Sequence, residues 1–365
     1  YEDVSTALTK TPTSLIRRSY SNPDFTSPTM SRLAPFFNWI FTNPTPSSPS
    51  YLRVLIEKLF GIHKMAKIPY ISAFHNTYLQ YERKRTKAIG NRIKDKKGEV
   101  ILYPCCYGNY NGVDGATALS RVLEHNNVEC KNMYFGCCGM PQLEEGNLKN
   151  VAKRAKNISE MIVKQIENSD CDAVVVPVSS CALMLKKEWP LLLPNDPNVK
   201  KVSEMTYDAS EYAIHLKKNK KLEPPQQEIK ANVVLHHACH NRAQNVGFKS
   251  LELLNSIPGV KVTSVQKCSG HGGLWGIQKE FFETGAKVGK PAIKQTRKKL
   301  AVARVLRTPL FVASDCPFAA NHIVQCVELE EGSVCSEMMA VHPIQLLARS
   351  YGYVGKLGSL LPPKR

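Results

Sequence analysis

Two adjacent cysteines between glycines, Cys137 and Cys138, constrain this chain more than any other feature. The flanking glycines permit a sharp turn, and such a turn can direct both thiolates at one metal centre. Further cysteines occur before this turn, at Cys106, and after it, at Cys181, so four thiols can converge. Soft thiolates in this number favour an iron-sulfur cluster or zinc over a hard cation. The alternative is a buried structural cysteine pair, because free cysteine is often buried in a core.

Length and composition limit the class of protein. The 365 residues, of which 43% are hydrophobic, allow roughly two domains with cores of their own. Twelve cysteines, some adjacent and some far apart, do not form a secreted disulfide scaffold, so metal ligation in a reducing compartment is expected. The net charge of +18 is compatible with nucleic acid, anionic lipid, an acidic partner or a basic matrix-type proteome. No zinc-finger spacing or aromatic-rich RNA-binding motif occurs, so nucleic acid is not expected as a partner.

The N-terminal region has a composition of its own. Residues 1–50 are rich in serine, threonine and proline, and the prolines exclude a long helix, which predicts an extended arm. Residues 17–21 form a basic, serine-rich patch typical of mitochondrial processing sites, although Glu2 and Asp3 do not fit an acid-free targeting signal. Four aromatic residues between positions 33 and 41 suit a membrane interface or a partner groove, with core packing as the alternative. No apolar run long enough for a transmembrane helix occurs.

An amphipathic helix is expected from Pro49 onward, on a membrane or on the domain itself. Its predicted apolar face holds Leu52, Leu55, Ile56, Leu59 and Phe60, and its predicted polar face holds Arg53, Glu57 and Lys58.

Strands and helices alternate regularly after a basic linker. Strands are expected at 99–103, around Tyr134 and at 173–178, with helices at 114–125 and 150–166. Each of these strands leads into one of the cysteine groups. Ligand sites of open α/β sheets are built at the carboxyl ends of the strands, so the cysteine groups are expected to lie together.

The second half of the chain repeats this plan. Strands expected at 232–237, 260–265 and 310–315 lead to Cys239, Cys268 and Cys316, and corresponding cysteines are offset by 131 to 135 residues. The fold class is therefore α/β, with two tandem homologous domains that have parallel-sheet, Rossmann-like cores. The expected organisation is an arm, amphipathic helix and basic linker at 1–98, a first domain at 99–222, a second domain at 230–352 and a tail at 353–365.

With these residues assembled, the chain resembles the CCG-domain cysteine-rich family, in which a C…CCG…CxxC pattern occurs twice. That family includes the B component of heterodisulfide reductase, the iron-sulfur subunits of glycolate and lactate oxidases, and the C component of anaerobic glycerol-3-phosphate dehydrogenase. The last is the most similar, and the resemblance covers about residues 50–352. It rests on the segment 106–110, Cys239-His240, the segment 268–280, Asp315-Cys316 and the segment 342–344.

In the first domain the resemblance implies a [4Fe-4S] cluster. Its ligands would be Cys106, Cys137, Cys138 and Cys181, with Cys105 as a spare, because Val178 stands where the closing CxxC begins. Four ligands suffice for such a cluster.

The second domain has lost part of the family pattern. Ser269 replaces the second cysteine of the adjacent pair, and Ala319 replaces the last cysteine of the closing CxxC. Three thiolates suit a [3Fe-4S] centre, a labile [4Fe-4S] centre completed by a histidine or a substrate, or zinc with one histidine; an empty site is the alternative. The candidate metal ligands are Cys239, Cys268, Cys316, His240 and His271. Beside them, Asp315 is expected to orient a histidine or a cluster edge, with lysine pairing as the alternative.

The resemblance implies an electron-transfer subunit, itself non-catalytic, of a membrane-associated, quinone-linked respiratory dehydrogenase such as a succinate or glycerol-3-phosphate system. The alternative is a structural accessory subunit of a mitochondrial-type respiratory complex, with a structural metal and no redox role. Residues 1–98 contain no cysteine and so lack the ferredoxin segment usual in the family. No nucleotide-binding fingerprint is present.

Partners are therefore required. They are expected to be a flavin dehydrogenase or a ferredoxin-type iron-sulfur subunit, a membrane surface or membrane-embedded subunits, and, indirectly, quinone. The expected location is peripheral, on the matrix side of the mitochondrial inner membrane or the cytoplasmic face of a bacterial membrane.

Overall fold

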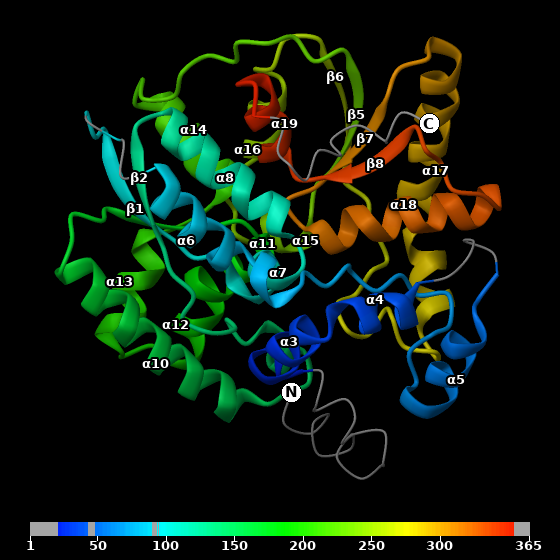
Figure 1. The fold of residues 1–365 in the computed structure, drawn as a ribbon, viewed down its shortest axis with the longest axis horizontal. Helices are drawn as coiled ribbons and strands as arrows, with labels where there is room; N and C mark the ends of the chain where they lie inside the picture. Colours follow the sequence, from blue (N-terminus) through cyan, green and yellow to red (C-terminus); the bar gives the residue numbers. More distant parts are fainter. Residues whose placement is uncertain (1–20, 43–47, 90–92, 94, 354–365) are drawn as a thin grey trace. The chain divides into compact units, whose positions relative to one another are not determined.

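The computed structural model describes residues 21–42, 48–89, 93 and 95–353. Contacts divide the chain into two units, one made of residues 1–38 and 70–212 and the other of residues 39–69 and 213–365. The described part of each unit holds one four-stranded sheet, and every strand pair in both sheets is parallel (Figure 1). This confirms the predicted α/β fold class with two parallel-sheet cores.

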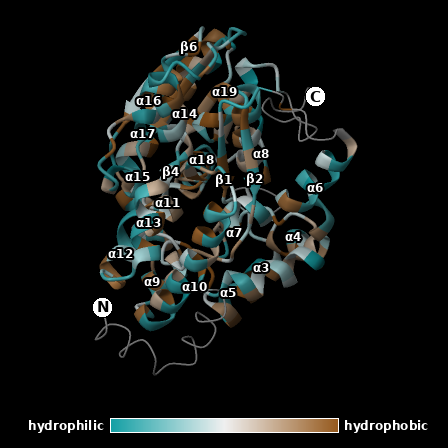
Figure 2. Cartoon of the chain, turned by 90° about the vertical axis from the view of Figure 1, so that its left-hand side faces the viewer, coloured by the Kyte–Doolittle hydropathy of each residue, from teal (hydrophilic) through white to brown (hydrophobic). Residues whose placement is uncertain are grey.

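The sheet of the first unit has the strand order β2-β1-β3-β4. All four residues of β3 are buried, as expected for a hydrophobic run in a central parallel strand. The helices around it are amphipathic, with hydrophilic and hydrophobic residues interleaved (Figure 2). The strands are β1 Gly98–Leu102, β2 Val128–Asn132, β3 Ala173–Val176 and β4 Thr206–Asp208, and the longer helices are α6 Tyr78–Ile89, α8 Val113–His125, α10 Leu148–Glu167 and α13 Pro197–Met205. The boundary between the units falls within α14, Ala209–Lys218.

The sheet of the second unit has the equivalent order, β6-β5-β7-β8, so the repeat seen in the cysteine spacing is also a repeat of topology. Strands β4 and β8 were not predicted, because β4 has only three residues and neither strand leads into a cysteine group. The strand expected around Tyr134 ends earlier, at Asn132. The elements are β5 Ala231–His236, β6 Val260–Val265, β7 Leu310–Ala313 and β8 Met338–Val341, with α16 Lys249–Leu254, α17 Phe282–Leu306, α18 Pro317–Glu331 and α19 Pro343–Ser350.

The prediction of an extended N-terminal arm is wrong for residues 23–41. They form two short helices, α3 Pro23–Arg32 and α4 Ala34–Phe41. Pro23 is the first residue of its helix and Pro35 the second of the next, where a missing N–H costs nothing. A hydrogen bond to a distant segment adds stability, because the Ser31 hydroxyl of α3 donates to the Ser72 carbonyl at 2.6 Å. The basic patch at 17–21 lies outside the described residues except for Ser21, and so does nearly all of the predicted tail.

The amphipathic helix is present as α5, Tyr51–Phe60, but its faces are not those predicted. Arg53 is completely buried and donates hydrogen bonds to the backbone carbonyls of His63, Lys64 and Ala66, at 2.5–3.2 Å. Burial lowers the pKa of its guanidinium to about 10. Leu55, by contrast, is 50% exposed. The prediction assumed that a charged residue faces solvent, whereas three carbonyls gathered in one loop can hold a buried arginine.

The described helices include none with the length and hydropathy of a membrane span.

Candidate metal centre

The cysteines of the first unit follow the carboxyl ends of its strands. Cys105 and Cys106 begin α7, Cys105–Tyr110, directly after β1, and Cys181 lies in α11, Ser179–Leu183, after β3. The coil after β2 leads to Cys137 and Cys138. Parallel strands bring these three segments to one edge of the sheet, and the Cys106 and Cys137 sulfurs lie 3.8 Å apart.

The Cys137-Cys138 turn depends on its two glycines. Gly136 has φ +120° and Gly139 has φ +95°, which side chains rarely allow, and a Cβ on Gly139 would lie 3.3 Å from Val151. Two buried aromatic side chains hold the turn at its backbone carbonyls. The Trp189 indole donates to the Cys138 carbonyl at 3.0 Å, and the Tyr103 hydroxyl donates to the Gly136 carbonyl. Hydrogen bonds thus hold the turn at the residue before Cys137 and at Cys138.

The thiols of this unit interact in a continuous series. The pKa of Cys138 is raised by hydrogen bonding with the Cys137 and Cys181 thiols and then by burial. The pKa of Cys106 is raised by its hydrogen bond with Cys137 and by burial. Cys137 is the exception, because the neighbouring thiols of Cys106 and Cys138 and the Gly139 N–H, 3.5 Å away, lower its pKa. The Cys137 sulfur is therefore surrounded by hydrogen-bond donors.

Cys105, treated as a spare in the sequence, belongs to the same group. Its thiol interacts with that of Cys181, and burial raises its pKa to about 12. Its backbone has φ +59°, an uncommon conformation for a residue with a side chain. Such backbone strain is often found at functional sites. Nothing in the spacing of the cysteines encodes this conformation, which is why the sequence did not place Cys105.

The donor set of the first group fits an iron-sulfur cluster. All twelve cysteines are free. Of the five in this group, Cys105, Cys138 and Cys181 belong to one buried core cluster, Cys137 is also buried, and Cys106 is half-buried. Buried thiolates crowded together need compensating positive charge, which iron supplies. Within the described ranges, no three histidine, cysteine, aspartate or glutamate side chains are arranged to hold a single metal ion. A [4Fe-4S] cluster is a larger group than one ion, and each of its irons takes one thiolate.

The second group also follows strand ends, but it is more open. Cys239 follows β5, Cys268 follows β6, and Cys316 is the N-cap of α18 after β7. Cys239 and Cys268 are exposed and Cys316 is half-buried. Burial and the nearby Cys268 thiol raise the pKa of Cys239. Burial also raises the pKa of Cys316, and the Cys239 thiol raises it further. The three thiols are thus neighbours.

Histidines and aromatic rings lie beside these thiols. The His271 ring stacks on Phe318, with centroids 5.4 Å apart and planes within 5°. Burial, and then the neighbouring His322 and His240, lower the pKa of His271 to about 3. His240 therefore lies near His271, and the role of the two as metal ligands stays a prediction. The sequence did not single out His322, which sits inside α18 in a pattern typical of a core helix.

Asp315, beside Cys316, lies in a buried polar group with Ser250 and His342. Its carboxylate accepts a hydrogen bond from Ser250 and lies 3.7 Å from His342 Nε2, and all three side chains are buried. His342 also caps α19, because its Nδ1 accepts the Ile344 N–H at 3.1 Å. His342 is not one of the candidate metal ligands, so the expected role of Asp315 toward the metal site stays a prediction.

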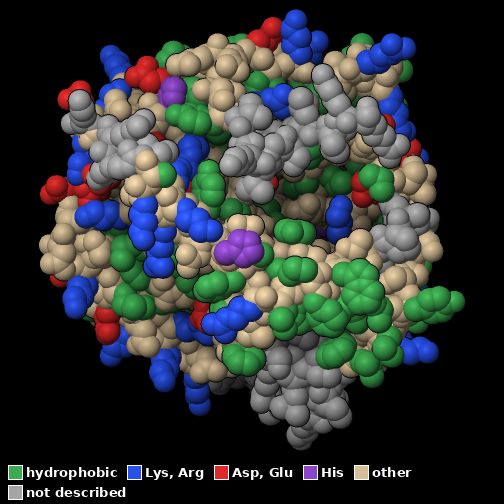
Figure 3. Space-filling view, in the orientation of Figure 1, with side chains coloured by type: hydrophobic (Ala, Val, Ile, Leu, Met, Phe, Trp, Pro, Cys, Tyr) green, Lys and Arg blue, Asp and Glu red, His purple; other side chains and the backbone are tan. Residues whose placement is uncertain are grey.

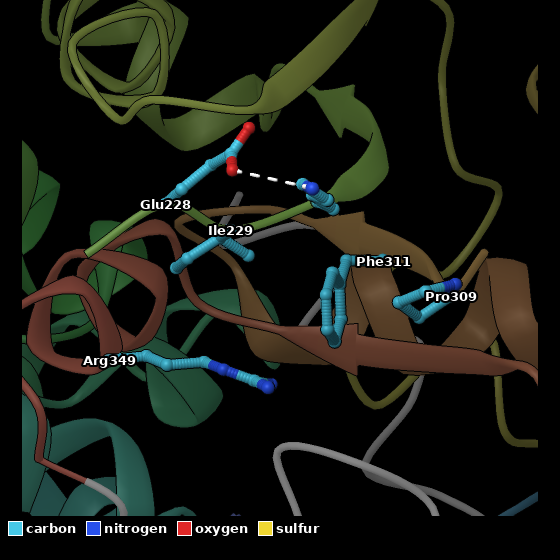
Figure 4. Close-up of a pocket in the computed structure, with 6 residues that line it drawn as sticks. Glu228, Ile229, Pro309, Phe311 and Arg349 are labelled. Carbon is cyan, nitrogen blue, oxygen red and sulfur yellow. Dashed lines mark ion pairs between the residues drawn. The ribbon is translucent and has the colours of Figure 1, made fainter.

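A cavity of about 350 Å³ lies at the amino ends of β5 and β7 (Figure 4). Cys239 and Cys316 follow the carboxyl ends of these two strands. The lining of the cavity mixes apolar and charged side chains, with an ion pair of 3.7 Å between Glu228 and Lys230. The lining residues are Glu228, Ile229, Lys230, Pro309, Phe311 and Arg349.

Residues 100–186 match the CCG cysteine-rich domain. The C component of the anaerobic glycerol-3-phosphate dehydrogenase of Escherichia coli K12 is 24% identical over 313 residues, which are 84% of this chain and 71% of that protein. The B component of the fumarate reductase (CoM/CoB) of Methanothermobacter marburgensis is 28% identical over 254 residues, 67% of this chain and 45% of that protein. The D component of the dihydromethanophenazine:CoB–CoM heterodisulfide reductase of Methanosarcina barkeri is 24% identical over 315 residues, 82% of this chain and 71% of that protein.

The matched domain begins in β1 and ends after Cys181, so it contains all five thiols of the first group. The three relatives are named as subunits of a dehydrogenase or of reductases. With its cysteine groups at the ends of parallel strands, the chain carries a CCG cysteine-rich domain at residues 100–186 and is similar to these redox subunits.

Proposed function

We propose that this protein is an electron-transfer subunit of a multi-subunit dehydrogenase or reductase. Its iron-sulfur cluster would be held by Cys106, Cys137, Cys138 and Cys181. The observation that carries the proposal is the buried thiol series of the first unit, centred on a rigid turn. The names of the relatives, all subunits of redox enzymes, support it. When bound, such a cluster accepts and passes on single electrons.

The residues around the turn keep water away from this centre. Trp189 and Tyr103 are fully buried and are bonded to the two carbonyls of the turn, while Cys137 and Cys138 are each 1% exposed. A site of this kind changes shape little when its charge changes, which favours fast electron transfer. The electron donor would be a partner dehydrogenase, and the finer proposal is a quinone-linked respiratory complex.

Metal and acid-labile sulfide analysis of anaerobically purified protein, with an EPR spectrum, tests this proposal. We expect about four iron and four sulfide per chain if only the first site is filled. Zinc as the only metal would end the electron-transfer interpretation.

A structural role for the second unit is the second candidate. Two of its three thiols are exposed, and Phe318 covers one face of the His271 ring. An accessory subunit with a scaffold in place of the second centre would have these features.

Membrane attachment is part of the proposal, and α5 is its proposed surface. Tyr51, Leu55, Leu59 and Phe60 are 97%, 50%, 57% and 46% exposed. Figure 3 shows hydrophobic side chains gathered toward the lower right, where α4 and α5 lie in Figure 1. Exposed apolar side chains on a helix of a basic protein suit an anionic lipid surface, because apolar burial and charge attraction add.

Serine at Leu55, Leu59 and Phe60 is expected to weaken binding to vesicles of phosphatidylcholine and phosphatidylglycerol at least about tenfold, given the apolar area removed. Sedimentation with the vesicles measures the fraction of protein bound. Leu191→Ser, at a leucine that is 75% exposed on α12, Trp189–Leu192, is the control and should bind as the wild type does. Unchanged binding of the triple variant would move the attachment away from α5. Deletion of the N-terminal region is a poorer test, because it removes Asp24 from the cysteine turn.

A further inference from the structure

The N-terminal helix α3 reaches the cysteine turn through one carboxylate. Asp24 Oδ1 accepts hydrogen bonds from the Cys137 N–H and from the Tyr134 hydroxyl, both at 2.8 Å. Its other oxygen would lie 3.4 Å from a Cβ built on Gly136. Asp24 therefore contacts the segment that leads to Cys137 at two residues, and a side chain at Gly136 would touch it as well.

Arg154 of α10 completes this contact. Its guanidinium forms an ion pair with Asp24 and donates to Asn22 Oδ1 at 2.8 Å and Gln142 Oε1 at 2.9 Å. The Asp24 and Arg154 side chains are 31% and 20% exposed, so solvent only partly screens their charges. A balanced pair of charges thus lies beside a candidate ligand.

We propose that Asp24 and Arg154 are positioning residues that set the reduction potential of the centre at Cys137, with opposite effects. The inference rests on the proposed cluster at this site. Reduction adds one electron, received from a partner dehydrogenase, and makes the centre more negative. The carboxylate opposes that change and the guanidinium favours it. Asp24 also takes up the Cys137 N–H, which then cannot donate to a cluster sulfur, and such bonds raise the potential.

The signs of the shifts separate this role from a merely structural one. Asp24→Asn and Arg154→Gln break the same ion pair, so a structural defect would act in the same direction in both variants. The charge that remains differs between the two variants. Asp24→Asn leaves the Arg154 cation uncompensated beside the centre, and Arg154→Gln leaves the Asp24 anion uncompensated. The double variant is neutral again.

An EPR-monitored redox titration of the full chain measures the effect, after iron and sulfide are quantified in each protein. We expect Asp24→Asn to increase the ratio of reduced to oxidised centre about tenfold at a given applied potential. This corresponds to a reduction potential about 59 mV higher for one electron. We expect Arg154→Gln to lower it by a similar amount and the double variant to lie near the wild type.

The control is Asp196→Asn, which removes the same charge from the first unit. Asp196 accepts the N–H groups of Asn198 and Val199 at 2.9 and 3.1 Å as the N-cap of α13, and its substitution should leave the potential unchanged. Shifts of equal sign in Asp24→Asn and Arg154→Gln, or none in either, with iron retained, would overturn this inference and leave the proposed function standing. Wild-type protein without iron would overturn both.

Amide exchange gives a second readout that needs no cluster. Asp24→Ala removes the acceptor of the Cys137 N–H, so this amide should exchange faster with solvent in the metal-free protein, whereas Asp24→Asn keeps an acceptor and should protect it. Equal protection in Asp24→Ala and wild type would contradict the contact itself.

Discussion

Replacing Cys138 with serine is expected to abolish cluster binding in the first unit. Cys138 is 1% exposed and lies between the thiols of Cys137 and Cys181, so its loss interrupts the series at its centre. A serine hydroxyl is a harder and weaker ligand than a thiolate. Because metal binding is coupled to folding, the loaded protein should also lose stability on the order of several kcal/mol.

Iron content and thermal unfolding of the anaerobic protein measure this result. The metal-free forms are compared as well, since a buried hydroxyl without a partner costs about 1–3 kcal/mol by itself. Cys171→Ser is the matched control: Cys171 is also buried, but its thiol bonds to Glu99, at 3.4 Å, outside the group. It should keep its iron. Full iron content in Cys138→Ser would show that the ligand set is wrong.

Replacing Gly289 with alanine is expected to destabilise the second unit strongly. Gly289 lies within α17, where alanine normally favours the helix by up to about 1 kcal/mol. Here a Cβ would lie 2.4 Å from the Ser269 carbonyl oxygen, in the turn that carries Cys268. Backbone cannot yield as a flexible side chain can, so the helix and the turn must separate. We expect a loss of about 3 kcal/mol, the upper end for overpacking.

Gly115→Ala provides the control for this effect. Gly115 also lies in a helix, α8, and a Cβ there meets nothing within 4 Å. That variant should be neutral or up to about 1 kcal/mol more stable. Chemical denaturation measures the free energy of unfolding of both variants. An equal response of the two proteins would mean that α17 does not press on the cysteine turn.

The sequence by itself determined the repeated α/β plan. Buried parallel strands appear as apolar runs such as Ala173–Val176, and cysteines after each run mark the edge where the strands end. These signals are local and occur twice at similar spacing, so the two sheets and the two groups of thiols could be predicted. Short strands and the backbone of Cys105 carry no such signal.

Only the tertiary structure decided which distant residues complete the first group. Asp24 and Cys137 are separated by 113 positions, and no periodicity connects a proline-rich helix to a cysteine turn. Arg53 was assigned to solvent because charge alone suggests exposure, yet three carbonyls of a following loop bury it. In both cases a polar group is held by partners brought together by folding, and a single residue's hydropathy cannot predict where those partners will be.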